Sequence, residues 1–99
     1  MLIHTVFFWL RKSAPKSARA ALVKDCLKYL NTPTVKHLWA GPPAATAERP
    51  VIDATYDVGL TVIFDDLQGH DAYQEHPDHL KFIARNKKHW QKVAVYDVQ

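Results

Sequence analysis

Residues 2–9, LIHTVFFW, constrain the fold more than any other stretch, because both sides of the extended chain are apolar. β-branched and aromatic residues dominate the segment and predict a strand. Successive side chains of a strand point to opposite faces. The two faces are His4, Val6 and Phe8 on one side, and Ile3, Thr5, Phe7 and Trp9 on the other. A strand of this kind needs a packing layer on each face.

Hydrophobic spacing along the rest of the chain predicts a helix, two strands, a second helical region and a final strand. In chain order these elements cover residues 15–31, 34–41, 55–64, 67–88 and 92–98, and Pro77 interrupts the second helical region. The segment PPAATAERP, residues 42–50, contains three prolines and is predicted to be a loop. The order β-α-β-β-α-β predicts a single α+β domain over residues 1–99 with the ferredoxin-like arrangement. In that arrangement a four-stranded antiparallel sheet carries the helices on one face.

The second sheet face then has no cover within one chain. In the last strand Val93 and Val95 alternate with Ala94, Tyr96 and Val98, so this strand is also apolar on both sides. An apolar area of this size is unusual on a monomer. The pattern therefore predicts a homodimer in which a second copy packs sheet to sheet.

The composition indicates a soluble cytoplasmic protein. Hydrophobic residues make up 47% of the chain and charged residues 23%, and no apolar run is long enough to span a membrane. The N-terminus is apolar first and basic afterwards, the reverse of a signal peptide. The single cysteine, Cys26, excludes an internal disulfide and fits a reducing compartment. The net charge of +3 comes largely from residues 10–19 and 85–92 at helix ends, so we expect a solvated surface and no nucleic-acid partner.

The stretch AYQEHPDHLKF, residues 72–82, carries the candidate chemistry. Pro77 suits the first helical position and disfavours helical geometry at the residue before it, which places His76 at the cap. His79 then lies in the first turn, where the positive end of the helix opposes its protonation. A neutral imidazole near pH 7 is what a general base requires. Tyr73 could donate a hydrogen bond to a developing enolate oxygen, and His4 would face the same region if its strand face meets the helices.

Each of these residues also has a purely structural interpretation. His79 could bond a backbone carbonyl and fix the helix start, and His4 could be a sheet histidine with a satisfied partner. Tyr73 could be a core aromatic residue.

A metal site is not expected from the sequence. His76 and His79 are separated by the Pro77 break, and the remaining histidines at positions 37, 70 and 89 are scattered over other elements. We therefore predict no metal and no cofactor.

Three stretches together resemble the stress-responsive A/B barrel (Dabb) family, a branch of the dimeric α+β barrel proteins. They are LIHTVFFWL, TYDVGLTVIFDD and AYQEHPDHLKF, of which the His-Pro-Asp-His piece with its preceding tyrosine is the most specific. The resemblance covers nearly the whole chain. It implies a homodimer whose two sheets close into a barrel with the helices outside, and in some members a pocket between sheet and helices.

One branch of this family is similar to plant polyketide cyclases such as olivetolic acid cyclase, which close a ring by aldol condensation without a cofactor. By position the resemblance implies catalytic roles for Tyr73 and His79, helped by His4. The cyclase has a further histidine where this chain has Val58 and a tyrosine where it has Asp25.

We therefore predict a small homodimer that binds a small, largely apolar molecule in a pocket between sheet and helices. Its wall would include Val6, Phe8, Val58 and His76. One alternative is a cofactor-independent, cyclase-like enzyme with His79 as base and Tyr73 as its partner. Another is a cofactor-free oxygenase, a class that the same superfamily contains.

Overall fold

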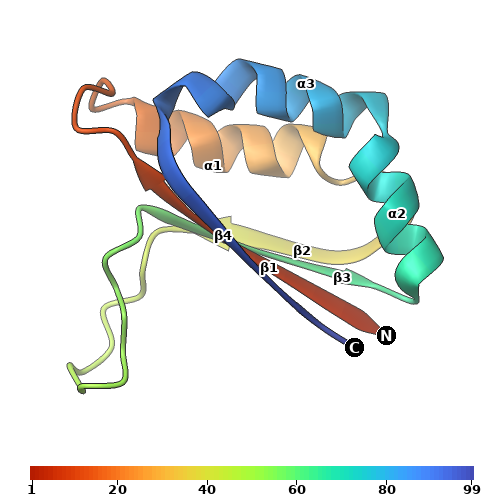
Figure 1. Cartoon of the computed structure of the whole chain (residues 1–99), viewed down its shortest axis with the longest axis horizontal. Coiled ribbons are helices and arrows are strands. Elements are labelled where there is room, and N and C mark those ends of the chain that lie inside the picture. Colours follow the sequence, from red (N-terminus) through yellow and green to blue (C-terminus); the bar gives the residue numbers. More distant parts are fainter.

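The computed structural model describes all 99 residues and has a sheet under a layer of helices (Figure 1). Its elements are β1 (Leu2–Leu10), α1 (Ala18–Tyr29), β2 (Val35–Gly41), β3 (Val58–Phe64), α2 (Leu67–Glu75), α3 (Pro77–Asn86), a short 3-10 turn η1 (Lys87–His89) and β4 (Trp90–Val98). The predicted order of elements is confirmed. The second helical region is two helices that meet at Pro77, as the proline predicts.

The four strands form one antiparallel sheet in the order β2-β3-β1-β4. The predicted ferredoxin-like sheet is therefore confirmed, with β1 and β3 in the centre. β1 pairs with β3 so that His4 lies opposite Val62, and with β4 so that His4 lies opposite Asp97. Opposed residues of an antiparallel pair share a face, so this register decides which side chains meet beneath the helices.

All the helices lie on one side of the sheet (Figure 1). Every second side chain of β1 and β3 faces the helices, and these side chains form most of the core. The buried members on these strands are Leu2, Val6, Phe8, Val58, Leu60, Val62 and Phe64, each at most 5% exposed. Leu22, Cys26 and Leu30 pack onto them from α1 and the turn after it. Alternation along β1 and β3 therefore separates the buried side chains from those of the opposite face.

The opposite sheet face, which we call the open face, lacks any covering element. Trp39 on β2 is 57% exposed, and Tyr96 and Val98 on β4 are each 62% exposed. In the centre of the face, Phe7 is half-buried beneath the ring of Tyr56, with ring centroids 4.7 Å apart. The bare apolar face predicted for the single chain is therefore present.

Tyr56 lies on the other side of the sheet from the one that strict alternation predicts. The sequence pattern puts it on the same face as Val58, but regular β3 begins only at Val58. The preceding residue, Asp57, accepts hydrogen bonds from the backbone N–H of Leu10 at 2.7 Å and from Arg19 at 2.7 Å. These contacts turn the chain before the strand begins, and the Tyr56 ring crosses to Phe7 on the open face.

Asp25 joins the two long helices. Its carboxylate accepts hydrogen bonds from Arg85 Nε and Asn86 Nδ2, each at 2.9 Å, so a side chain of α1 ties down the end of α3. Burial raises the pKa of this carboxyl, but the bonds from Arg85 and Asn86 outweigh that effect and hold the pKa below its usual value.

None of the helices has both the length and the apolar character needed to cross a bilayer.

Candidate functional site

The junction between α2 and α3 sets the positions of the two candidate residues on either side of it. His76 is extended, with φ −63° and ψ 138°, and its Nδ1 accepts the backbone N–H of Asp78 at 3.0 Å. Pro77 follows as the first residue of α3. The capping position predicted for His76 is confirmed. The break turns α3 so that its first turn comes back towards Tyr73, the one buried residue of α2.

Tyr73, His79 and His4 meet beneath the helices, although they come from α2, α3 and β1. The ring centroids of Tyr73 and His79 are 4.7 Å apart with the planes inclined by 68°. Those of His4 and Tyr73 are 5.9 Å apart and inclined by 70°. All three side chains are buried, with at most 8% of their surface exposed. The structure thus brings together the three residues that the sequence singled out.

His79 is buried without a hydrogen-bond partner at Nδ1, and its side chain makes no hydrogen bond in the chain. The backbone-carbonyl interpretation of His79 therefore does not describe this structure; the capping role belongs to His76. Burial, together with the nearby His4 and His70, lowers the pKa of His79 to about 4. The imidazole of His79 is therefore neutral near pH 7, and its Nδ1 atom is buried without a hydrogen-bond partner.

Tyr73 is 1% exposed, and burial raises the pKa of its phenol well above the ordinary value. Its hydroxyl stays protonated throughout the neutral range. Tyr73 can therefore act as a hydrogen-bond donor at this site but not as a phenolate.

His4 is held by a residue that sequence reasoning missed. Its Nδ1 lies 2.5 Å from Asp97 Oδ1, and Asp97 projects from β4 with 43% of its side chain exposed. Burial lowers the pKa of His4, whereas the hydrogen bond and the charge of Asp97 raise it, and burial prevails. An aspartate on Nδ1 orients the imidazole and leaves Nε2 free. The antiparallel register of β1 and β4 is the signal that places these two residues opposite each other.

His70 also belongs to the cluster, so the expectation that it lies apart from the other candidate residues is wrong. The centroid of its ring, on α2, is 5.1 Å from that of His4. His70 lies one helical turn before Tyr73, which brings both side chains to the same side of α2.

His4, His70 and Asp97 are the set of side chains best placed to hold a metal ion. One ligand atom of each lies within 4.8 Å of the others. His4 and Asp97 are already hydrogen bonded to each other, so a metal that used those atoms would have to replace the bond. Two imidazoles and a carboxylate form a ligand set that suits zinc or iron.

The remaining predicted wall residues lie in the hydrophobic core. Val6, Phe8 and Val58 are at most 5% exposed and pack against other side chains of the sheet and helices. The main cavities of the monomer lie elsewhere, and none of them is lined by Tyr73, His79 or His4. A molecule that reached the cluster would therefore have to displace side chains or enter where the helices part.

An antiparallel sheet in the order β2-β3-β1-β4 with its helices on one face is a ferredoxin-like fold. Its buried cluster includes His79, the last residue of the His-Pro-Asp-His stretch. The model of the stress responsive A/B barrel domain (Dabb) matches residues 2–99. The chain belongs to this family. No curated protein matches the sequence.

Solved structures of the same fold include a Dabb family protein, a protein of unknown function and an enzyme. A Dabb family protein from Mesorhizobium loti is 26% identical, with 99% of this chain and 94% of that chain covered and a TM-score of 0.79. A dimeric ferredoxin-like protein of unknown function from Thermobifida fusca is 19% identical, with 98% and 88% covered and a TM-score of 0.79. The hydroxynitrile lyase of Passiflora edulis is 16% identical, with 98% and 90% covered and a TM-score of 0.80.

Proposed function

We propose that this protein is a cytoplasmic homodimer that binds a small, largely apolar molecule beneath its helices, at the cluster of Tyr73, His79 and His4. The observation that carries the proposal is the Nδ1 atom of His79, which is buried and has no partner. A buried polar group without a hydrogen bond costs about 1–3 kcal/mol. Such a cost is typical of functional positions, where a ligand supplies the missing partner.

The chemistry of the cluster suits a ligand with a carbonyl or hydroxyl group on an apolar body. The Tyr73 hydroxyl is a donor, whereas neutral His79 offers one donor and one acceptor nitrogen. Around them lie apolar and aromatic side chains, among them Phe64, whose ring centroid is 5.0 Å from that of Tyr73. A few polar groups within an apolar wall are the usual composition of a small-molecule site. Val6, Phe8, Val58 and His76 would form or border that wall after a modest outward shift of α3.

The dimer would form through the open face. A second copy laid on it would bury Trp39, Tyr96 and Val98, which are the most exposed large hydrophobic side chains of the sheet. The dimeric ferredoxin-like protein from Thermobifida fusca supports this assembly. The cytoplasm is a compartment in which the single, buried thiol of Cys26 stays reduced.

A second candidate function is proton transfer next to a carbonyl or a hydroxyl-bearing carbon, without a cofactor. The His4–Asp97 pair favours it, because a carboxylate on Nδ1 stabilises an imidazolium that forms during a reaction. In the cyclase-like version His79 is the base and Tyr73 orients the substrate oxygen. The hydroxynitrile lyase of Passiflora edulis, an enzyme on the same fold, gives this candidate further support. Against it, a pKa of about 4 makes His79 a weak base in the empty site.

The binding proposal is tested by a thermal-shift screen of small aromatic and alkyl compounds that carry a carbonyl group. We expect a binder to raise the melting temperature of the wild type and to lose that effect in His79→Leu. Leu80→Ala is the matched control, because Leu80 is the next residue of α3 but is 56% exposed. If no compound shifts the wild type, or if binders act equally on His79→Leu, the cluster is not the binding site.

The enzymatic candidate is tested with the best binder as substrate. Turnover should disappear in His79→Ala, fall less in Tyr73→Phe, and fall in Asp97→Asn with the binding affinity retained. A compound that binds tightly and is returned unchanged would leave only the binding function.

A further inference from the structure

The connection between β2 and β3, residues 42–57, projects away from the body on the side of the sheet opposite the helices (Figure 1). We call these residues the arm. Loops of more than about 12–15 residues without secondary structure are uncommon in compact domains and are usually either functional or disordered. Every residue of the arm from 44 to 55 is exposed. The arm therefore adds nothing to the core of its own chain.

The composition of the arm does not suit permanent exposure to water. Alanine, proline, valine and isoleucine make up most of the segment PAATAERPVIDA, residues 43–54, and its only charges are Glu48, Arg49 and Asp53. Val51 at the tip is 78% exposed and Ile52 is 38% exposed. Exposed apolar side chains that gather in one segment mark a contact surface.

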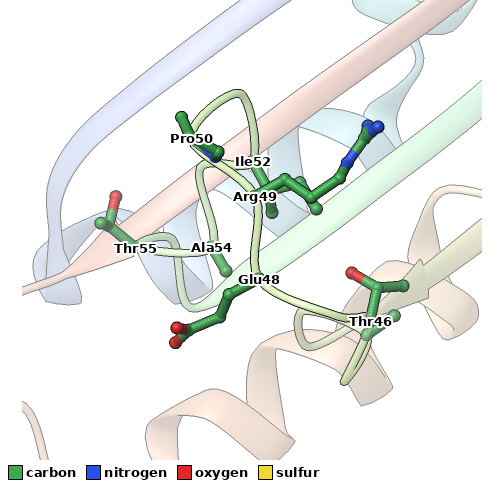
Figure 2. A pocket seen from close by; sticks show the side chains of 8 residues that line it. Thr46, Glu48, Arg49, Pro50, Ile52, Ala54 and Thr55 are labelled. Carbon is green, nitrogen blue, oxygen red and sulfur yellow. The ribbon is translucent and has the colours of Figure 1, made fainter.

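The arm nevertheless has a defined shape. A turn at its tip is closed by the backbone bond from Ile52 N–H to Arg49 O at 2.9 Å. Near its base, Trp9 Nε1 donates to Thr55 Oγ1 at 3.0 Å, and Asp53 accepts from the backbone of Thr55 at 2.9 Å. The two limbs border an open, concave space of about 530 Å³, lined only by arm residues (Figure 2).

The base of the arm is continuous with the open face. Tyr56 packs on Phe7, and a groove of about 280 Å³ beside these rings runs from Trp39 and Pro42 to Thr5. Any body that lies on the open face would therefore also meet the inner side of the arm. The occupant most consistent with this geometry is a second copy of the chain, because the open face is the surface on which the proposed dimer would form.

We infer that the arm clasps the second subunit of the dimer, with Val51 and Ile52 as its main apolar contacts. This inference rests on the proposed dimer. A two-fold axis makes the contact reciprocal, so two arms bind simultaneously in every dimer. Each arm extends the interface beyond the sheet and covers apolar side chains that are otherwise exposed to water.

The test compares dimer dissociation constants by analytical ultracentrifugation over a dilution series. Val51→Asp and Ile52→Asp should each raise the dissociation constant of the dimer at least tenfold. Leu80→Asp is the matched control, because it places the same charge on a similarly exposed leucine of the helix layer, and it should change the constant less than twofold. Far-UV circular dichroism should be the same in all four proteins, since neither Val51 nor Ile52 belongs to the core.

The two failures can be told apart. A wild type that stays monomeric at every concentration overturns the dimer and with it the arm contact. A wild-type dimer whose dissociation constant is unchanged by both arm substitutions overturns the arm contact alone.

Discussion

Replacing His79 by leucine should stabilise the protein, although it removes a side chain from the proposed site. His79 is 8% exposed, its Nδ1 has no partner, and the ring packs between Tyr73 and Phe82. The native protein therefore bears the cost of an unpaired buried polar group, about 1–3 kcal/mol. Leucine fills a similar volume without polar atoms. We expect the free energy of unfolding to rise by about 1–2 kcal/mol at neutral pH, which corresponds to about 4–8 °C in melting temperature for each kcal/mol in a domain of this size.

The same substitution should change the pH dependence of stability. The pKa of His79 is about 4 in the folded protein and 6.5 as the unperturbed value. Between these values the unfolded chain binds more protons than the folded one, so the stability of the wild type falls as the pH falls. The difference of about 2.5 units corresponds to a loss of about 2 kcal/mol at pH 5. His79→Leu lacks this contribution, so its advantage over the wild type should widen by about that amount between pH 7.5 and pH 5.

The assay is urea denaturation of wild type and His79→Leu at several pH values and one fixed protomer concentration, because the proposed dimerisation would make stability depend on concentration. His4, Asp25 and the other titrating groups are common to both proteins and cancel in the difference. A variant less stable than the wild type at pH 7.5 would refute the argument, because it would show that His79 has a structural partner. A stability difference that does not change with pH would refute the lowered pKa.

Three further predictions follow from other parts of the structure. Phe7→Asp should produce monomers or unfolded protein by sedimentation, because it would bury an unpaired charge against the partner sheet; a wild type that is already a stable monomer would contradict the premise. Asp25→Ala should lower the free energy of unfolding by about 1–3 kcal/mol, because it removes the acceptor for Arg85 and Asn86. The control Lys24→Ala, on the exposed side of α1, should have no measurable effect. Since the pKa of Asp25 is lowered on folding, the stability that Asp25 contributes should also decrease as the pH drops towards that pKa. Elemental analysis of protein purified without a histidine tag should find less than one equivalent of zinc, iron or copper, because His4 and Asp97 already satisfy each other; a stoichiometric metal whose removal unfolds the protein would overturn this prediction.

The parts of the fold that local patterns control were predictable from the sequence. The division of β1 and β3 into two alternating faces follows from the strand period, and the break at Pro77 follows from the missing amide of proline. The position of Tyr56 was not predictable in this way. It depends on the contacts of Asp57 with Leu10 and Arg19, which are distant in the sequence.

The candidate site was predictable only in part, for a related reason. Tyr73, His76 and His79 lie in one motif, so their mutual placement follows from a helix break. Asp97 is separated from its partner His4 by almost the whole chain, and only the register of two strands joins them. His70 is an isolated histidine in the sequence, and only the packing of α2 over β1 brings it next to His4.

The open face and the buried cluster are linked through β4. Tyr96 and Val98 lie on the open face, whereas Asp97 between them points to the other side and holds His4. β4 is an edge strand, and most of its side chains are exposed in the single chain, so within one subunit its pairing with β1 is the main restraint on it. A second copy packed on Tyr96 and Val98 would fix this strand and, with it, the carboxylate that orients His4. Dimerisation would therefore do more than cover apolar surface: it would hold one member of the candidate site in place, which gives a physical reason for a chain of this size to keep one sheet face bare.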